Sequence, residues 1–320
     1  MTLNQLKVFV LVVRLGSLRA AAAALAVSEP AVSQALGALR EHLGDPLVER
    51  AGGVLTLTPA GQRVIGLASQ MVNLAVATEE AVRVASGAPD LLRVVASADV
   101  GDAVAPALLQ AFDRRAANVE TTLAIAGTRE MAVLLSERLA DVALGPALAG
   151  PQAPGVVSES LLRYRLLLIT GADHPLQSNG GASRQALRNE PWLVDPSGTD
   201  PLSDVGRLLA DLGVAEGRVR VFPTQASAWA AAATSGGVAP AIEQLWKREP
   251  HIGARPLKFA GMPLDMLWHI STLHGDRRSA TAARLHRFLA TPDATQAMFR
   301  ADGGVPASQF RPPVYVSIWS

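Results

Sequence analysis

Residues 17–47 read SLRAAAAALAVSEPAVSQALGALREHLGDPL. An alanine-rich apolar run ends at Ala26 and Val27, and a second helix begins at Ser28. Ser17 and Ser28 suit the position before each helix, because a hydroxyl there accepts from the unpaired amides of the first turn. The stretch therefore predicts two short helices joined by a tight turn.

The second of these helices has two distinct faces. Apolar residues recur at helical spacing on one face, at Val32, Leu36, Leu39 and Leu43. The opposite face carries short polar or small groups and one base, at Ser33, Gln34, Gly37 and Arg40. A helix that buries one stripe and exposes short polar side chains is what reading the major groove of DNA requires. Helix pairs are also common in proteins that bind no DNA, so the pattern alone leaves both readings open.

A resemblance to a known family rests on a set of residues that occur in a fixed order between Ser17 and Gly61. They are Ser17, Leu18, Ala21, Ala22, Leu25, Val27, Ser28, Pro30, Ala31, Val32, Ser33, Leu36, Leu39, Leu43, Gly44, Leu47, Arg50, Leu57, Thr58, Pro59, Ala60 and Gly61. Together they resemble, without a gap, the N-terminal domain of LysR-type transcriptional regulators. The resemblance implies a winged helix-turn-helix and a regulator of transcription that responds to a small-molecule effector.

Composition sets limits on the rest of the chain. Its 320 residues suggest two or three compact units, and 49% hydrophobic residues supply ample core. The absence of cysteine excludes disulfides, thiolate catalysis and cysteine-based zinc sites. The apolar run at residues 8–13 is broken by Arg14, and no later run is long enough to span a membrane. We expect a cytoplasmic protein with no membrane partner.

Charge gives little support for nucleic-acid binding. Residues 1–63 carry six basic and four acidic side chains, a net charge of +2. This is weak for a module that neutralises phosphates. The prediction of DNA binding rests on the motif.

The residues on either side of the helix pair complete a first domain. Thr2 and Gln5 have capping-box spacing and predict a helix from Leu3 to Gly16. Residues 46–58 contain two short β-prone runs around Gly52 and Gly53, which predict a hairpin. By the resemblance this hairpin is the wing of a domain at 1–58, although an ordinary surface hairpin has the same pattern.

A long helix is predicted at residues 59–85, with Thr58 as its cap and Pro59 at its first position. Two adjacent apolar stripes run along it, more than a helix lying on one surface needs. We expect a linker at 59–88 that pairs two subunits in a dimer, and further assembly to a tetramer. A helix inside one large core remains the alternative. Gly87 and Pro89 end the helix.

From residue 89 the pattern alternates between strand and helix, which indicates an α/β fold with a parallel sheet. The resemblance implies an effector-binding domain at 89–300 like type 2 periplasmic binding proteins. Its subdomain I would comprise about 89–162 and 267–300, and subdomain II about 163–266, joined by two connecting segments. Residues 301–320 form a proline-rich tail whose apolar end could add a strand to a sheet edge.

Effector contacts are expected in the loops that follow strands, where helix N-termini offer free amides. The candidates are Ser97, Asp99, Val100, Thr128, Arg129, Gly145, Pro146, Thr199, Asp200, Thr224 and Gln225. Arg129 could hold an effector carboxylate through a bidentate pair. Alternatively, Asp99 could neutralise Arg129, which would favour a neutral or amine-bearing effector.

The resemblance also assigns roles at the DNA surface. Ser33 and Gln34 would read base edges, and Ser28, Arg50 and Thr56 would contact phosphates, with Glu29, Pro30, Ala31 and Gly37 completing the surface. The chain departs from the family pattern in having Glu29 where glutamine is common, Gly53 in place of a basic wing residue, and Ala35 and Gly37 at often polar positions. These departures predict modest affinity per half-site, with an oligomer binding several half-sites together.

The sequence shows no catalytic motif and no cofactor loop. His251, His269, His274 and His286 lack partners at metal-ligand spacing. We therefore expect no enzyme activity, no cofactor and no metal. Double-stranded DNA, a small-molecule effector and a second copy of the chain are the expected partners, and RNA polymerase is a further candidate. The alternative is a cytoplasmic small-molecule binder or enzyme whose helical N-terminus only dimerises.

Overall fold

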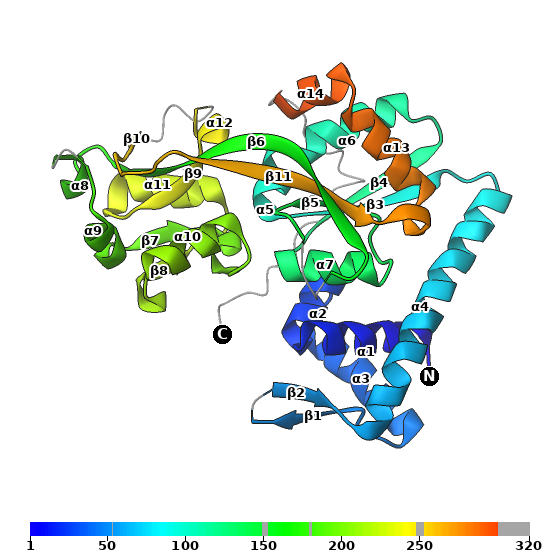
Figure 1. The fold of residues 1–320 in the computed structure, drawn as a ribbon. Helices are drawn as coiled ribbons and strands as arrows, with labels where there is room; N and C mark the ends of the chain where they lie inside the picture. Colours follow the sequence, from blue (N-terminus) through cyan, green and yellow to red (C-terminus); the bar gives the residue numbers. More distant parts are fainter. Residues whose placement is uncertain (53, 149–152, 179–180, 248–252, 300–320) are drawn as a thin grey trace.

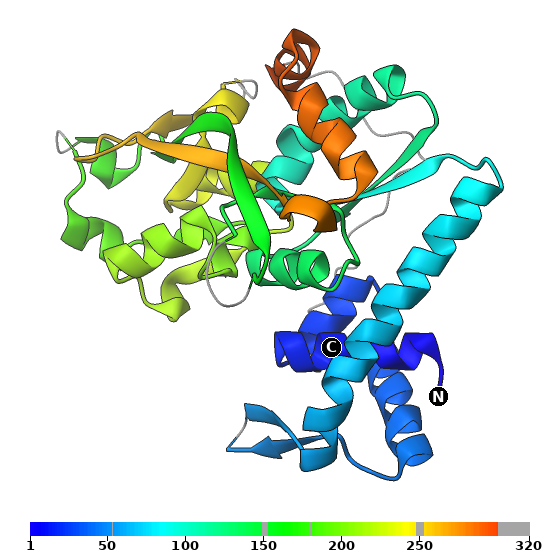
Figure 2. The ribbon, with the colours of Figure 1, turned by 45° about the vertical axis from the view of Figure 1, so that its right-hand side comes forward.

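The computed structural model describes residues 1–299 except 53, 149–152, 179–180 and 248–252 (Figure 1). The predicted tail at 301–320 lies outside the described residues. An N-terminal head, a long helix and two α/β subdomains follow one another along the chain (Figures 1 and 2). The fold class predicted from sequence is confirmed.

Three helices form the body of the head: α1 (Leu3–Leu15), α2 (Leu18–Leu25) and α3 (Glu29–Leu43). Thr2 and Gln5 form the predicted capping box. Ser17 and Ser28 cap α2 and α3 as predicted, each accepting from an amide at 3.4 Å. Leu43 departs from the prediction, because it lies in the last turn of α3 and remains 39% exposed.

The wing is the antiparallel pair of β1 (Val48–Ala51) and β2 (Val54–Leu57). Gly52 makes its turn with a left-handed φ of 58°. The wing leads directly into α4 (Pro59–Ala85), which Thr58 caps through the amide of Gly61 at 3.0 Å. Gly61 is required there, since a Cβ at this position would lie 2.0 Å from the Leu47 carbonyl oxygen. The close packing of α4 on the head therefore depends on that glycine.

Only one of the two apolar stripes of α4 is covered. Ala68 and Val72 are buried in the core of the head, against which α4 packs. The other stripe includes Leu67 and Leu74, and each of these two residues is more than 60% exposed. The alternative of a helix buried inside one core is therefore wrong for this half of its surface.

Subdomain I is built on the parallel strands β3 (Asp90–Ala96), β4 (Val119–Ile125) and β5 (Val142–Gly145). Its helices are α5 (Ala98–Ala103), α6 (Ala105–Arg115), α7 (Thr128–Ser136), α13 (Ala280–Leu289) and α14 (Pro292–Phe299). The helices lie on both faces of the strands (Figure 1). This is the βαβ arrangement that the alternating pattern predicted.

Two long strands connect the subdomains, β6 (Val156–Gly171) and β11 (Leu264–Leu273). They pair antiparallel along most of their length, and the register shifts between Trp268 and His269. The sheet order is β10-β6-β11-β5-β3-β4, with β9 also paired to β6. The predicted parallel sheet is confirmed for β3, β4 and β5, and the connecting strands β6 and β11 add antiparallel pairs to it.

Subdomain II adds β9 (Ala239–Ile242) and β10 (Ala254–Pro256) to β6. It also holds a separate parallel pair, β7 (Trp192–Val194) and β8 (Val219–Val221). Around them lie α8 (Pro175–Ser178), α9 (Arg184–Asn189), α10 (Asp204–Leu212), α11 (Gln225–Ser235) and α12 (Glu243–Trp246), with short 3-10 turns at η1 (Pro196–Thr199), η2 (Glu216–Arg218) and, after β11, η3 (Gly275–Arg277).

Within the described part of the chain, no individual helix is both long enough and apolar enough to span a membrane. Only α2 and α3 taken together pass such a test, and they meet at an angle of 109°.

Candidate DNA-binding and effector sites

One face of α3 is held firmly while the other is open. Val32, Leu36 and Leu39 are at most 2% exposed and anchor the helix in the core of the head. The predicted DNA-contacting residues of α3 and its cap are all exposed: Ser28, Glu29, Pro30, Ala31, Ser33, Gln34 and Gly37. A Cβ at Gly37 would meet nothing within 4 Å. Figure 2 shows α3 and the wing at the end of the molecule away from the sheet.

The wing offers fewer free groups than the sequence suggested. Arg50 and Thr56 are exposed on paired strands, but the Thr56 hydroxyl donates to the Glu49 carbonyl at 3.3 Å. Arg40 is directed inward and donates to the Val48 carbonyl at 3.3 Å, which ties α3 to the wing. Arg14 is paired with Glu137, the residue just after α7. Two of the six basic residues of the head region are thus used within the protein.

Several of the predicted effector residues from the two subdomains meet at one place, which we call the junction. The backbone amide of Thr128, at the start of α7, donates to Asp200 Oδ2 at 2.8 Å. Ser97 follows β3 and lies beside Gly145 at the end of β5, where a Cβ would come within 2.7 Å of the Ser97 hydroxyl. Asp99 accepts from the Trp268 indole at 2.8 Å. Segments more than seventy residues apart in the chain are thus brought together.

Not every predicted effector residue faces the junction. Val100 is fully buried in the apolar core of the two subdomains. Thr224 and Gln225 begin α11, where the Thr224 side chain caps the helix through Ser227. Among the described residues, no hydrogen bond or ion pair joins Thr224 or Gln225 to the other candidates. Pro146 is buried after β5, and Thr199 is exposed at the end of η1.

Arg129 has a different environment from either predicted one. It is exposed, and its guanidinium donates to the Arg14 carbonyl of α1 at 3.4 Å. Asp99 does not neutralise it, since Asp99 bonds the indole of Trp268 instead. Arg129 therefore faces the head.

Two further acidic residues of the junction, Asp195 and Asp204, were not predicted from the sequence. Asp195, directly after β7, and Asp204, at the start of α10, lie close enough to Asp99 to raise its pKa, although burial is the larger cause. Burial also raises the pKa of Asp195, which accepts from the Ser197 hydroxyl at 2.7 Å. Burial likewise raises the pKa of Glu130. The sequence did contain a signal that Asp195 is a site residue, because it is an acidic residue directly after the apolar run Trp192-Leu193-Val194.

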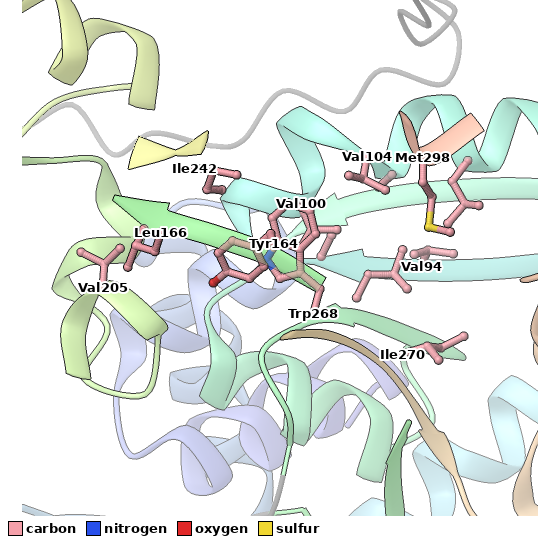
Figure 3. Packing of buried hydrophobic residues seen from close by; sticks show 14 of the residues in the cluster. Val94, Val100, Val104, Tyr164, Leu166, Val205, Ile242, Trp268, Ile270 and Met298 are labelled. Atoms are coloured by element: carbon pink, nitrogen blue, oxygen red, sulfur yellow. The ribbon is translucent and has the colours of Figure 1, made fainter. Parts of the chain in front are cut away.

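Two aromatic residues of the connecting strands were also missed. Tyr164 on β6 stacks on Trp268 on β11 (Figure 3). The Tyr164 hydroxyl donates to Asp204. Burial raises the pKa of Tyr164, so the phenol stays a proton donor. Among the described residues, no group of three or more potential ligands could hold a metal ion.

Comparisons with known families cover nearly the whole chain. Residues 3–62 match the bacterial regulatory helix-turn-helix protein, lysR family. Residues 85–292 match the LysR substrate binding domain. An uncharacterized HTH-type transcriptional regulator of Mycobacterium tuberculosis is 32% identical over 324 residues, covering 100% of both chains. The HTH-type transcriptional regulator CfxR of Cupriavidus necator is 28% identical, covering 90% of this chain and 91% of its own.

Solved structures share the fold at lower identity. Full-length CbnR complexed with its target DNA aligns with a TM-score of 0.53 and 20% identity, covering 93% of this chain and 100% of the other. A point mutant of full-length BenM aligns with a TM-score of 0.54 and 20% identity, covering 92% of this chain and 97% of the other.

Proposed function

The chain belongs to the LysR family of bacterial transcriptional regulators, and we propose how its parts serve a DNA-binding regulator that responds to a small molecule. The observation that carries this proposal is the exposed face of α3 around Ser33 and Gln34, above a buried stripe. A hydroxyl and an amide on a firmly anchored helix can hydrogen-bond base edges in the major groove. The relative CbnR has been solved with its target DNA.

Phosphate contacts would position this helix without reading sequence. Ser28, Arg50 and Thr56 are all exposed on the head. Arg63 joins them, because it is exposed near the start of α4.

Dimerisation would place two heads on one operator. The exposed apolar stripe of α4 carries Leu67, Met71, Leu74 and Val82 at 40–67% exposure. A second copy of α4 would bury this stripe, and pairs of dimers would bind several half-sites together.

The effector would bind at the junction between the subdomains. The junction holds Asp99, Asp195, Asp204 and Asp200, while Arg129 is directed toward α1. Arg207 pairs with Asp204, but no ion pair is found among the described residues for Asp99, Asp195 or Asp200. This excess of acidic groups favours a neutral or amine-bearing effector over a carboxylate. A thermal-shift screen of metabolites matched in size and differing in charge tests this. Stabilisation by carboxylates and not by amines would contradict it.

A gel shift with the intergenic DNA beside the gene tests the DNA-binding role. The double variant Ser33→Ala and Gln34→Ala should abolish the specific shift, while its thermal unfolding stays unchanged because both side chains are exposed. A matched control, Ser86→Ala with Gln110→Ala, changes the same residue types at exposed positions outside the head and should keep the shift. An unchanged shift in the first variant would remove the role of α3.

The same gel shift separates this function from its rival. A cytoplasmic small-molecule binder or enzyme with a helical dimerisation segment would give no specific shift. A bacterial regulator of transcription acts on DNA in the cytoplasm, and no catalytic role is proposed for any residue.

A further inference from the structure

The head packs directly on subdomain I. Met131, Leu134 and Leu135 of α7 belong to the same buried apolar cluster as Phe9 and Leu15 of α1. Figures 1 and 2 show α7 next to α1 and α2. One continuous core thus joins the DNA-binding part of the chain to the effector-binding part.

A single buried carboxylate lies where three helices meet. The Glu137 side chain is 4% exposed, and its Oε1 accepts from Arg14 Nε of α1 at 2.8 Å. Its other oxygen accepts from the Ser69 hydroxyl of α4. A buried charge is costly unless such partners satisfy it. The position of Glu137, just after α7, therefore depends on where the head lies.

The other end of α7 reaches subdomain II. The Thr128 amide donates to Asp200 Oδ2 at 2.8 Å, and Asp200 Oδ1 accepts from the Leu202 amide at 2.9 Å. At about 1.5 Å per residue, this nine-residue helix is about 13 Å long. One short rigid element thus contacts the effector junction at its start and the head at its end.

The contact with the head is incompletely satisfied. Ser136 Oγ, beside Glu137, and Asn73 Oδ1, one turn beyond Ser69 on α4, are buried and have no hydrogen-bond partner among the described residues. Buried polar groups normally have partners. A second arrangement of α1, α4 and α7 could give these atoms hydrogen-bond partners. The interface between the head and subdomain I would then have two stable arrangements.

We propose that α7 links the relative position of the two subdomains to the orientation of the head, with Glu137 as the positioning residue. This proposal adds a regulatory element to the proposed function. It rests on the proposed function only for the statement that the head binds DNA. Movement of subdomain II changes the bond between Asp200 and Thr128, α7 shifts along its axis, and Glu137 carries α1 with it.

The test measures one distance between head and subdomain I. The chain has no native cysteine, so Glu41→Cys on α3 and Arg114→Cys on α6 accept spin labels at exposed positions without further changes. Pulsed electron paramagnetic resonance on the full chain, mixed with excess unlabelled chain, reports the distance within one subunit. A narrow distribution is expected for the parent.

Glu137→Ala and Asp200→Ala should each broaden the distribution, and Glu137→Gln should restore most of it because its amide oxygen still accepts. Arg14→Ala, at a side chain that is 48% exposed, probes the same pair where Glu137→Ala fails to fold. The matched control is Glu159→Gln, whose ion pairs with Arg278 and His286 lie within subdomain I. It should leave the distribution unchanged.

A broad distribution in the parent would show that the head is not docked, and an unchanged distribution in both Glu137→Ala and Arg14→Ala would remove the positioning role. Broadening by Glu137→Ala but not by Asp200→Ala would overturn the link through α7. The measurement contains neither DNA nor effector, so it succeeds or fails independently of the gel shift and the thermal-shift screen.

Discussion

The indole of Trp268 stacks on the ring of Tyr164, with centroids 4.5 Å apart and planes at 26° (Figure 3). The two residues come from the two strands that connect the subdomains. Trp268 donates to Asp99 of subdomain I, and Tyr164 donates to Asp204 of subdomain II. The stacked pair therefore fastens each subdomain to the connection between them.

Trp268→Phe should keep the stack and remove the indole donor. Asp99 would lose its 2.8 Å hydrogen bond in a buried place, so the free energy of unfolding should fall by about 1–3 kcal/mol. Urea unfolding measures this. Trp246→Phe is the control, because Trp246 is only partly buried and no indole hydrogen bond is found for it in the described residues. Equal losses in both variants would assign the effect to ring size.

Asp195→Asn should change the pH dependence of stability. Burial raises the pKa of Asp195 in the folded protein, so above its unfolded pKa the native state binds more protons than the unfolded one. The contribution of Asp195 to stability therefore falls as pH rises through the raised pKa. Asparagine can still accept from Ser197 and carries no charge. Relative to the parent, the variant should gain stability in urea unfolding as the pH rises from the ordinary aspartate pKa of 3.8 to neutral. The opposite sign would show that the carboxylate is stabilised where it lies.

Leu74→Glu should reduce self-association. Leu74 is 67% exposed in the centre of the apolar stripe of α4, and a carboxylate in a paired helix seam would be buried without a partner. Sedimentation velocity at micromolar concentration should show a smaller species with unchanged helix content. Gln62→Glu, exposed on another side of α4, should keep the size of the parent. If both variants sediment like the parent, this stripe is not the dimer contact.

Glu29→Gln should raise affinity for DNA by a few-fold at low salt. Glu29 is exposed at the first position of α3, where its charge faces the expected phosphates. The helix would lose about 0.3–1 kcal/mol of favourable dipole interaction. Fluorescence anisotropy with operator DNA measures the affinity, with Glu216→Gln in subdomain II as control. A loss of affinity at operators with cytosine opposite Glu29 would instead show that Glu29 accepts from the base.

The salt dependence of DNA binding should be moderate. Arg14 and Arg40 are used inside the protein, which leaves few cations in the head for phosphates. Each neutralised phosphate contributes about −0.9 to the slope of log K against log salt. A slope steeper than about −8 per dimer would contradict so sparse a set of contacts.

Local signals in the sequence determined the head and the long helix. Thr2, Ser17, Ser28 and Thr58 each occupy the capping position predicted for them. Capping and apolar spacing act over a few residues, so they can be read directly from the chain. The alternation of strand and helix predicted the α/β architecture, and the family resemblance predicted its division into two subdomains.

Tertiary structure alone decided the junction and the contact with the head. Trp268 meets Asp99 across 169 positions, and Arg14 meets Glu137 across 123. Arg129 was placed by sequence beside an effector, yet the packing of α7 on α1 turns it to the Arg14 carbonyl. Such contacts follow from the pairing of β6 with β11 and from the burial of α7 under the head, and no local pattern encodes either.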